Sequence, residues 1–120
     1  MTIHDPEKYC AGLWDWAILD GCFGNTRIRP TDIDGFVERN GRLLVIETKS
    51  PRAQIPHGQW ITFNELLKTG VFTIMVVWGN TNKPQAIQVM GRNGINDIAQ
   101  CDLKRLREWV SRWYMYADGI

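Results

Sequence analysis

The chain has 120 residues, the length of a single domain with one hydrophobic core. Its content of 44% hydrophobic and 22% charged residues is that of an ordinary soluble globular protein. A formal net charge of +1 does not indicate a histone-like polycation, and it does not exclude nucleic-acid binding, because the distribution of charge matters more than its sum.

The cysteines predict a reducing environment. There are three of them, Cys10, Cys22 and Cys101, without a CxxC spacing, so we expect free, small, buried thiols. Two lone histidines do not complete a structural zinc site. The sequence has neither a signal peptide nor an apolar run of membrane length, which predicts a cytoplasmic protein with no membrane partner.

A first helix is predicted from about Pro6. Asp5 is typical of an N-cap and proline of the first helical position, and the run "EKYCAGLWDWAILDG" continues the helix up to Gly21. Pro30 then begins an extended segment.

A β-hairpin is predicted at Asn40-Gly41, because this dipeptide favours the two-residue type I′ turn. The run "RLLVIETK" (residues 42–49) follows it and lacks strict alternation of polar and apolar residues. Such a run is typical of a strand that is covered on both faces.

The remaining elements complete a mixed sheet. We expect a loop at 51–58, a helix at 59–70, a central strand at 71–79, a strand nearer an edge at 83–90, and a final helix capped by Asp102. The central strand follows a helix, so it is expected to run parallel to the 42–49 strand through a right-handed crossover. Together these elements predict one α/β domain over residues 1–120, with a mixed β-sheet flanked by helices.

The register of the predicted hairpin brings charged residues together. Counting outward from the Asn40-Gly41 turn places Asp34 directly opposite Glu47, and Asp32 opposite Lys49. Opposed Cβ atoms on one face of a sheet lie only about 4.5–5.5 Å apart. Lys49 comes two residues after Glu47 on the strand and therefore points the same way.

Two carboxylates that are forced together repel one another, unless a cation lies between them. Hard oxygen ligands of this kind are the ones that Mg²⁺ binds. The register therefore favours Asp34 and Glu47 as metal ligands, although a β-bulge at Gly35 would shift the pairing by one residue. The alternative interpretation is a solvated strand end with mixed charges.

At these residues the sequence resembles a known family. The stretch "DGFVERNGRLLVIETKS" (34–50) resembles the core of the PD-(D/E)XK nuclease superfamily, in which an aspartate, a hairpin and an E-x-K motif follow one another. Asp34 lies 13 residues before Glu47, a spacing similar to that of archaeal Holliday-junction resolvases. The stretch "QIPHGQWITFNELLKTGVFTIMVVW" (54–78) resembles the VRR-Nuc branch, in which a glutamine opens a helix. The resemblance covers roughly residues 31–78.

The resemblance implies a restriction-endonuclease-like core, with the element order αβββαβ and a C-terminal helix. It implies a metal-dependent DNA endonuclease that hydrolyses phosphodiester bonds with Mg²⁺, for which Mn²⁺ can substitute. By position, Asp34 and Glu47 would be metal ligands, with the backbone carbonyl of Thr48 as a third. Lys49 would orient or activate the attacking water or stabilise charge on the phosphate, and Gln59 would position Lys49 or a phosphate.

Many family members also use an acidic residue of the first helix. The candidates are Glu7, Asp15 and Asp20, of which we choose Asp15 because it lies in the middle of the predicted helix. Asp20 lies near the helix C-terminus, where the dipole disfavours a carboxylate. Asp32 occupies a position at which the family usually has proline or a small residue, and we expect it to be a partner for Lys49.

Phosphate contacts would come from arginines near the site. We expect Arg27, Arg29, Arg52, Arg39 and Arg42 to contact DNA. So small a domain favours recognition of DNA structure over sequence, as in a phage-type junction resolvase acting as a homodimer. The alternatives are a less selective nicking or trimming nuclease, a catalytically silent DNA-binding or inhibitory protein with the nuclease fold, and a plain interaction domain.

Overall fold

The computed structural model describes residues 13–119, which belong to two units, Met1–Asp32 and Ile33–Ile120. Each unit is described by itself. In the described part of the first unit, a short 3₁₀ helix, η1 (Trp16–Leu19), is followed by turns in which Gly21 and Gly24 adopt positive φ angles. The α-helix predicted over residues 13–20 is therefore wrong, and its predicted start at Pro6 lies outside the described residues.

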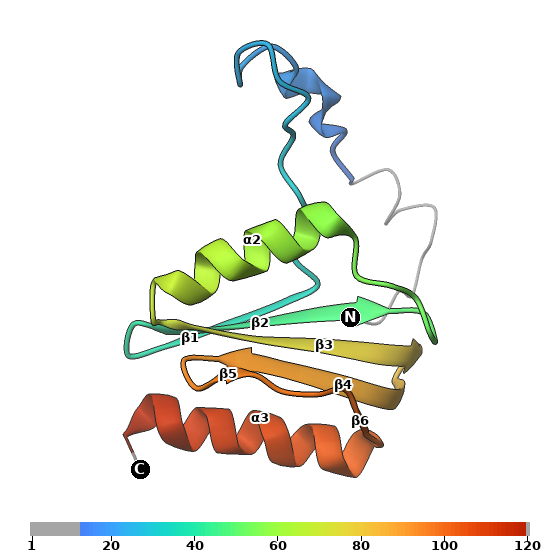
Figure 1. Ribbon diagram of the computed structural model, residues 1–120, viewed down its shortest axis with the longest axis vertical. Coiled ribbons are helices and arrows are strands. Elements are labelled where there is room, and N and C mark those ends of the chain that lie inside the picture. The colour runs from blue at the N-terminus through green and yellow to red at the C-terminus, as the bar shows by residue number, and fades with distance from the viewer. Residues whose placement is uncertain (1–12, 120) are drawn as a thin grey trace. The chain divides into compact units, whose positions relative to one another are not determined.

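The second unit is an α/β structure with a six-stranded, mostly antiparallel sheet and two helices (Figure 1). Its elements are β1 (Gly35–Arg39), β2 (Arg42–Lys49), α2 (His57–Lys68), β3 (Phe72–Asn80), β4 (Lys83–Gly91), β5 (Gly94–Ile95), β6 (Ala99–Gln100) and α3 (Leu103–Asp118). The strands follow the order β1-β2-β3-β4-β5, and β6 also pairs with β4. The mixed sheet with flanking helices is confirmed. Only two strands precede α2 among the described residues, so the predicted order αβββαβ is wrong there.

The predicted hairpin is confirmed, and its register is confirmed as far as Gly35, the first residue of β1. Asn40 and Gly41 have φ angles of 54° and 77°, as a type I′ turn requires. The antiparallel pairing runs without a bulge from Arg39 opposite Arg42 to Gly35 opposite Ile46. Strands β2 and β3 pair in parallel, as expected for two strands joined through a helix.

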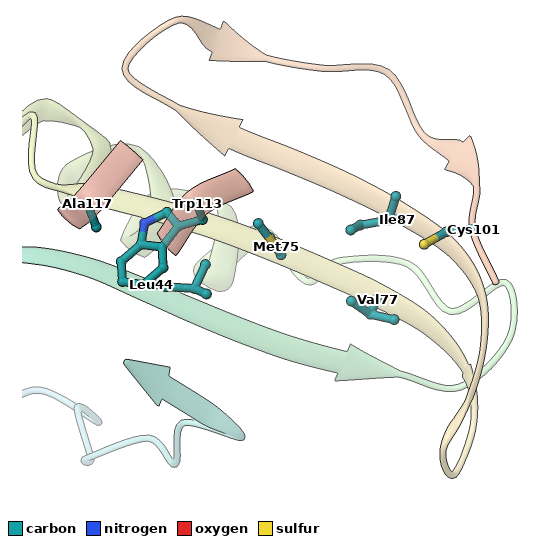
Figure 2. Close-up of a cluster of buried hydrophobic side chains, with 7 residues drawn as sticks. All are labelled: Leu44, Met75, Val77, Ile87, Cys101, Trp113 and Ala117. Carbon is teal, nitrogen blue, oxygen red and sulfur yellow. The ribbon is translucent and has the colours of Figure 1, made fainter. Parts of the chain in front are cut away.

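The sheet has a hydrophobic cluster on each face, and the two helices cover opposite faces (Figure 1). Side chains of β2 alternate between them: Leu44 belongs to the cluster under α3, and Val45 to the cluster under α2. Figure 2 shows the α3 cluster, in which Trp113 lies close to Leu44 and Met75. Strand β2 is therefore covered on both faces, as its apolar sequence predicts.

Helix α3 is held at both ends by hydrogen bonds. At its start, the Asp102 carboxylate accepts a hydrogen bond from the backbone N–H of Arg105 at 2.8 Å, which confirms the predicted cap. At its end, Arg42 Nη1 donates to the Tyr116 carbonyl at 2.6 Å, and Asn40 Nδ2 donates to the Ala117 carbonyl at 3.1 Å. The turn of the hairpin is therefore tied to the last turn of α3.

Cys22 and Cys101 are free thiols, as predicted. Cys101 is buried, but Cys22 is exposed, so the expectation of burial is wrong for Cys22; Cys10 lies outside the described residues. No helix in the described range 13–119 is both long and apolar enough to cross a membrane.

The turn can be tested with two glycine substitutions of opposite effect. We expect Gly41→Ala to lower the free energy of unfolding by about 1–2 kcal/mol, because alanine is strained at positive φ. The matched change Gly58→Ala, in α2, has open space around the new methyl group and should raise it by up to ~1 kcal/mol. Urea denaturation of both variants measures this. Equal stability of the two variants would contradict the turn geometry.

Candidate metal centre

Glu47 is a buried carboxylate at the end of an apolar strand. It is only 8% exposed, and among the described residues it is the one polar or charged residue that is buried. It is the sixth residue of β2 and lies on the same face as Val45, under α2. Since burial of a charged group costs free energy, Glu47 requires polar partners.

The first partner is Gln59 of α2. Gln59 is the third residue of this helix, and its side chain donates a hydrogen bond from Nε2 to Oε2 of Glu47 at 2.9 Å. The other end of the same amide, Oε1, is buried and has no hydrogen-bond partner among the described residues. A buried acceptor oxygen is thus left beside the Glu47 carboxylate, where a donor or a cation could satisfy it.

Asp34 comes to the site from the other strand of the hairpin. It directly precedes β1, and its Oδ2 accepts hydrogen bonds from the Thr48 backbone N–H at 2.9 Å and the Thr48 hydroxyl at 3.1 Å. Beyond Gly35, where β1 begins, the Asp34 carboxylate therefore accepts the hydrogen bond that a backbone carbonyl of a longer strand would accept from Thr48. Because N–H and C=O of one strand residue point to the same edge, the Thr48 carbonyl is directed to the Asp34 side.

The carboxylates of Asp34 and Glu47 lie near one another, and the positive charge of Lys49 does not balance both. Burial raises the pKa of Glu47 above its ordinary value of 4.5, and the nearby charge of Asp34 raises it further. The hydrogen bond from Gln59 and the charge of Lys49 act in the opposite direction without cancelling the increase. The charge of ionised Glu47 is therefore only partly compensated.

These groups fit a hard divalent cation. The described residues contain no group of three or more His, Cys, Asp or Glu side chains that could hold a metal. Mg²⁺ does not need one, because it usually retains several waters and binds through one or two carboxylates plus substrate phosphate. The oxygen donors present are the carboxylates of Asp34 and Glu47, the Thr48 carbonyl, and the unpartnered Gln59 Oε1.

The predicted acidic ligand of the first helix has another role within its own unit. Asp15 is the N-cap of η1, and its Oδ1 accepts from the Ala17 backbone N–H at 2.9 Å. Asp20 forms an exposed ion pair with Arg29, which lowers the pKa of Asp20 through hydrogen bonding. Glu7 lies outside the described residues, so the choice of Asp15 as a metal ligand stays a prediction.

Asp32 also has a partner within the first unit, where its Oδ1 accepts a hydrogen bond from Trp16 Nε1 at 3.3 Å. Its expected pairing with Lys49 stays a prediction. Arg27 of the same unit is exposed.

Two of the arginines predicted to contact DNA are engaged with α3. Arg39 donates to the Asp118 carboxylate and Arg42 to the Tyr116 carbonyl, and both guanidinium groups lie over tyrosine rings. Their contacts stabilise the packing of the hairpin turn against α3. Arg52 is different: it is exposed, and it holds a left-handed backbone conformation with φ of 64° in the loop that follows β2.

Trp78 is a site neighbour that sequence reasoning missed. It lies beside Lys49 in the parallel register of β2 and β3, and its Nε1 donates to the Ala53 carbonyl at 2.6 Å. This contact ties the loop that follows Lys49 to the centre of the sheet. Only the register of the parallel pair reveals it, because Trp78 is far from Lys49 in the sequence.

The raised pKa of Glu47 predicts a stability change with pH. Folded Glu47 holds its proton to a higher pH than the unfolded chain does, so the free energy of unfolding falls as pH rises from 4.5 through the folded pKa. Glu47→Gln removes this loss. We expect its melting temperature to exceed that of the wild type at about pH 7 in EDTA, and the difference to shrink at about pH 4.

Thermal melts across this pH range provide the measurement. Glu65→Gln is the matched control, because Glu65 is an exposed glutamate of α2 that pairs with Lys68. This substitution should change the free energy of unfolding by under ~0.5 kcal/mol. A Glu47→Gln variant that melts below the wild type at both pH values would contradict the charge conflict.

Metal binding should stabilise the folded protein independently of any activity. We expect Mg²⁺ at about 100 times its dissociation constant to add ~2.7 kcal/mol to the free energy of unfolding of the wild type. Glu47→Gln and Asp34→Asn should lose most of this gain, whereas Asp97→Asn, an exposed aspartate beyond β5, should keep it. The same gain in all four proteins would place the cation elsewhere.

Comparison with known proteins supplies no relative from which a role could be transferred. No protein-family model, no curated protein and no solved structure matches the chain.

Proposed function

We propose that the protein is a Mg²⁺-dependent phosphodiesterase that cuts DNA endonucleolytically. The observation that carries the proposal is the convergence of Asp34, Glu47, Lys49 and Gln59 at the end of β2. The hairpin places Asp34 against Thr48, Gln59 holds Glu47, and Lys49 follows on the face of Glu47. A solvated strand end would not bury one of two neighbouring carboxylates.

The arrangement of elements around the site supports a restriction-endonuclease-like core. A hairpin leads into a buried strand with the E-x-K motif, and α2 then crosses to a parallel strand, β3. Helices α2 and α3 cover the two faces of this sheet. Among the described residues, two strands precede α2, whereas the expected order has three. The proposal therefore depends on the site more than on the fold.

The residues have distinct roles in the proposed chemistry. A bound Mg²⁺ supplies Lewis acidity, which polarises a phosphoryl oxygen and lowers the pKa of water. Asp34 and Glu47 hold the cation through oxygen, and the Gln59 amide fixes the orientation of the Glu47 carboxylate. Lys49 adds positive charge where the phosphate gathers negative charge in the transition state. No residue has to form a covalent intermediate.

The proposed substrate is branched or otherwise structured DNA, as for a junction resolvase. Among the described residues, Arg52 is the exposed cation nearest in sequence to Lys49 and is suited to a phosphate contact. Two symmetric cuts in a four-way junction require two copies of the site, and hence a two-fold homodimer.

Cleavage of a labelled DNA panel tests this proposal. The panel holds a four-way junction, a flap, a nicked duplex, a linear duplex and a single strand, each with Mg²⁺, Mn²⁺ or EDTA. We expect metal-dependent cutting that Glu47→Gln and Lys49→Ala each reduce at least ~10²-fold, because each removes charge that acts on the transition state. The preferred substrate distinguishes a resolvase from a trimming nuclease.

Lys68→Ala is the matched control, because Lys68 is an exposed lysine at the far end of α2, paired with Glu65. It should cut at the wild-type rate. If no substrate is cut, while junction binding persists in both site variants, the protein is a binding module and the catalytic proposal fails.

A further inference from the structure

A second feature of the α2 face lies beside the candidate metal centre. It is a pocket of about 670 Å³, within the ~300–1,000 Å³ typical of ligand sites. Trp60 and Trp78 line it and belong to the hydrophobic cluster under α2. The loop that follows β2, residues 85–88 of β4, and Ile98 between β5 and β6 provide the remaining walls.

Two residues that line the pocket are neighbours of site residues. Trp60 directly follows Gln59 in α2, and Trp78 lies beside Lys49 in the parallel strands. The hydrogen bond from Trp78 Nε1 to the Ala53 carbonyl holds the loop over this region. The pocket is therefore adjacent to the end of β2 that carries Lys49.

The lining has the chemistry of a site for a planar polar ring. Three glutamines contribute amide groups: Gln54, Gln85 and Gln88. Gln88 Nε2 donates to the Asn96 carbonyl at 3.0 Å, whereas the other two amides have no side-chain hydrogen bonds among the described residues. Amides offer both donors and acceptors, and indole rings offer a stacking surface.

The charge of the lining narrows the class of ligand. None of the described residues that line the pocket is acidic, and Arg52 is the one cation among them. Arg52 lies in the loop that follows Lys49, so its positive charge favours an anionic group on this side of the pocket. An uncharged ring joined to a phosphate meets all of these conditions.

We propose that this pocket accepts an unpaired nucleobase of the DNA, next to the phosphate that Glu47 and Lys49 act on. The inference rests on the proposed function and narrows its substrate class. A base can enter only if it is unstacked from the duplex, which favours flaps, junction centres and single strands over intact duplex. Tryptophan supplies stacking, and the glutamine amides contact the edge of the base.

Equilibrium binding of short fluorescent oligonucleotides in EDTA tests the pocket without any cutting. A single strand is compared with the same strand carrying one abasic position, placed in turn at each site, and with its duplex. We expect the wild type to lose roughly 5- to 150-fold in affinity at one abasic position, the range that stacking of one base provides. Duplex should bind more weakly than the single strand.

Two variants locate the effect. Trp60→Leu should abolish the difference between the intact and the abasic strand. Since Trp60 is partly buried, the double variant Gln54→Ala/Gln85→Ala provides a second test on exposed residues and should weaken binding of the intact strand about 2- to 10-fold. The controls Asn64→Ala and Gln100→Ala remove exposed amides outside the pocket and should bind as the wild type does.

The outcomes separate the two proposals. Base-dependent binding without cleavage of any substrate would support the pocket and overturn the nuclease. Metal-dependent cleavage with equal affinity for intact strand, abasic strand and duplex would support the nuclease and overturn the pocket. An absence of oligonucleotide binding by the wild type, or an unchanged affinity in the double glutamine variant, would also overturn the pocket.

Discussion

The register of the Asn40-Gly41 hairpin determines which face of the sheet Glu47 and Lys49 occupy. Both turn residues hold positive φ angles, and the pairing then continues without a bulge to Gly35. Since side chains alternate between faces, a slip of one residue would move Glu47 to the face of α3, where Leu44 and Trp113 pack. Burial of the apolar side chains of β2 on both faces thus fixes the register that positions Glu47 and Lys49.

Burial of Glu47 gives the site an electrostatic conflict that the fold tolerates. The hydrophobic surroundings and the neighbouring Asp34 both disfavour the ionised carboxyl, and the Gln59 amide and the charge of Lys49 do not fully compensate. Sites that must bind a cation are commonly destabilised in its absence, because the charges that attract the cation repel one another. The remainder of the sheet, with its two hydrophobic clusters, provides the stability that this requires.

The sequence was sufficient to predict the hairpin, the parallel strands, and helices α2 and α3, because turn chemistry and apolar runs are local signals. The predicted register is observed as far as Gly35 opposite Ile46, one pair before Asp34 and Glu47. The helix predicted over residues 13–20 failed because Asp15 caps a single turn and Gly21 adopts a left-handed conformation. The hydrogen bonds of Asp34 to Thr48 and the glutamine-lined pocket depend on side chains placed by tertiary packing, for which periodicity carries no signal. Strands β5 and β6 are too short to show any period.

The link between the hairpin turn and the end of α3 has a consequence for how the protein folds. Asn40 donates a hydrogen bond to the carbonyl of Ala117, 77 residues further along the chain, and β2 pairs in parallel with β3. Contacts between such distant residues close large loops and form slowly. During synthesis the turn would remain without its α3 partner until Tyr116 and Ala117 have left the ribosome. A nascent chain can thus attach its hairpin turn to α3 only after every strand of the sheet has been synthesised.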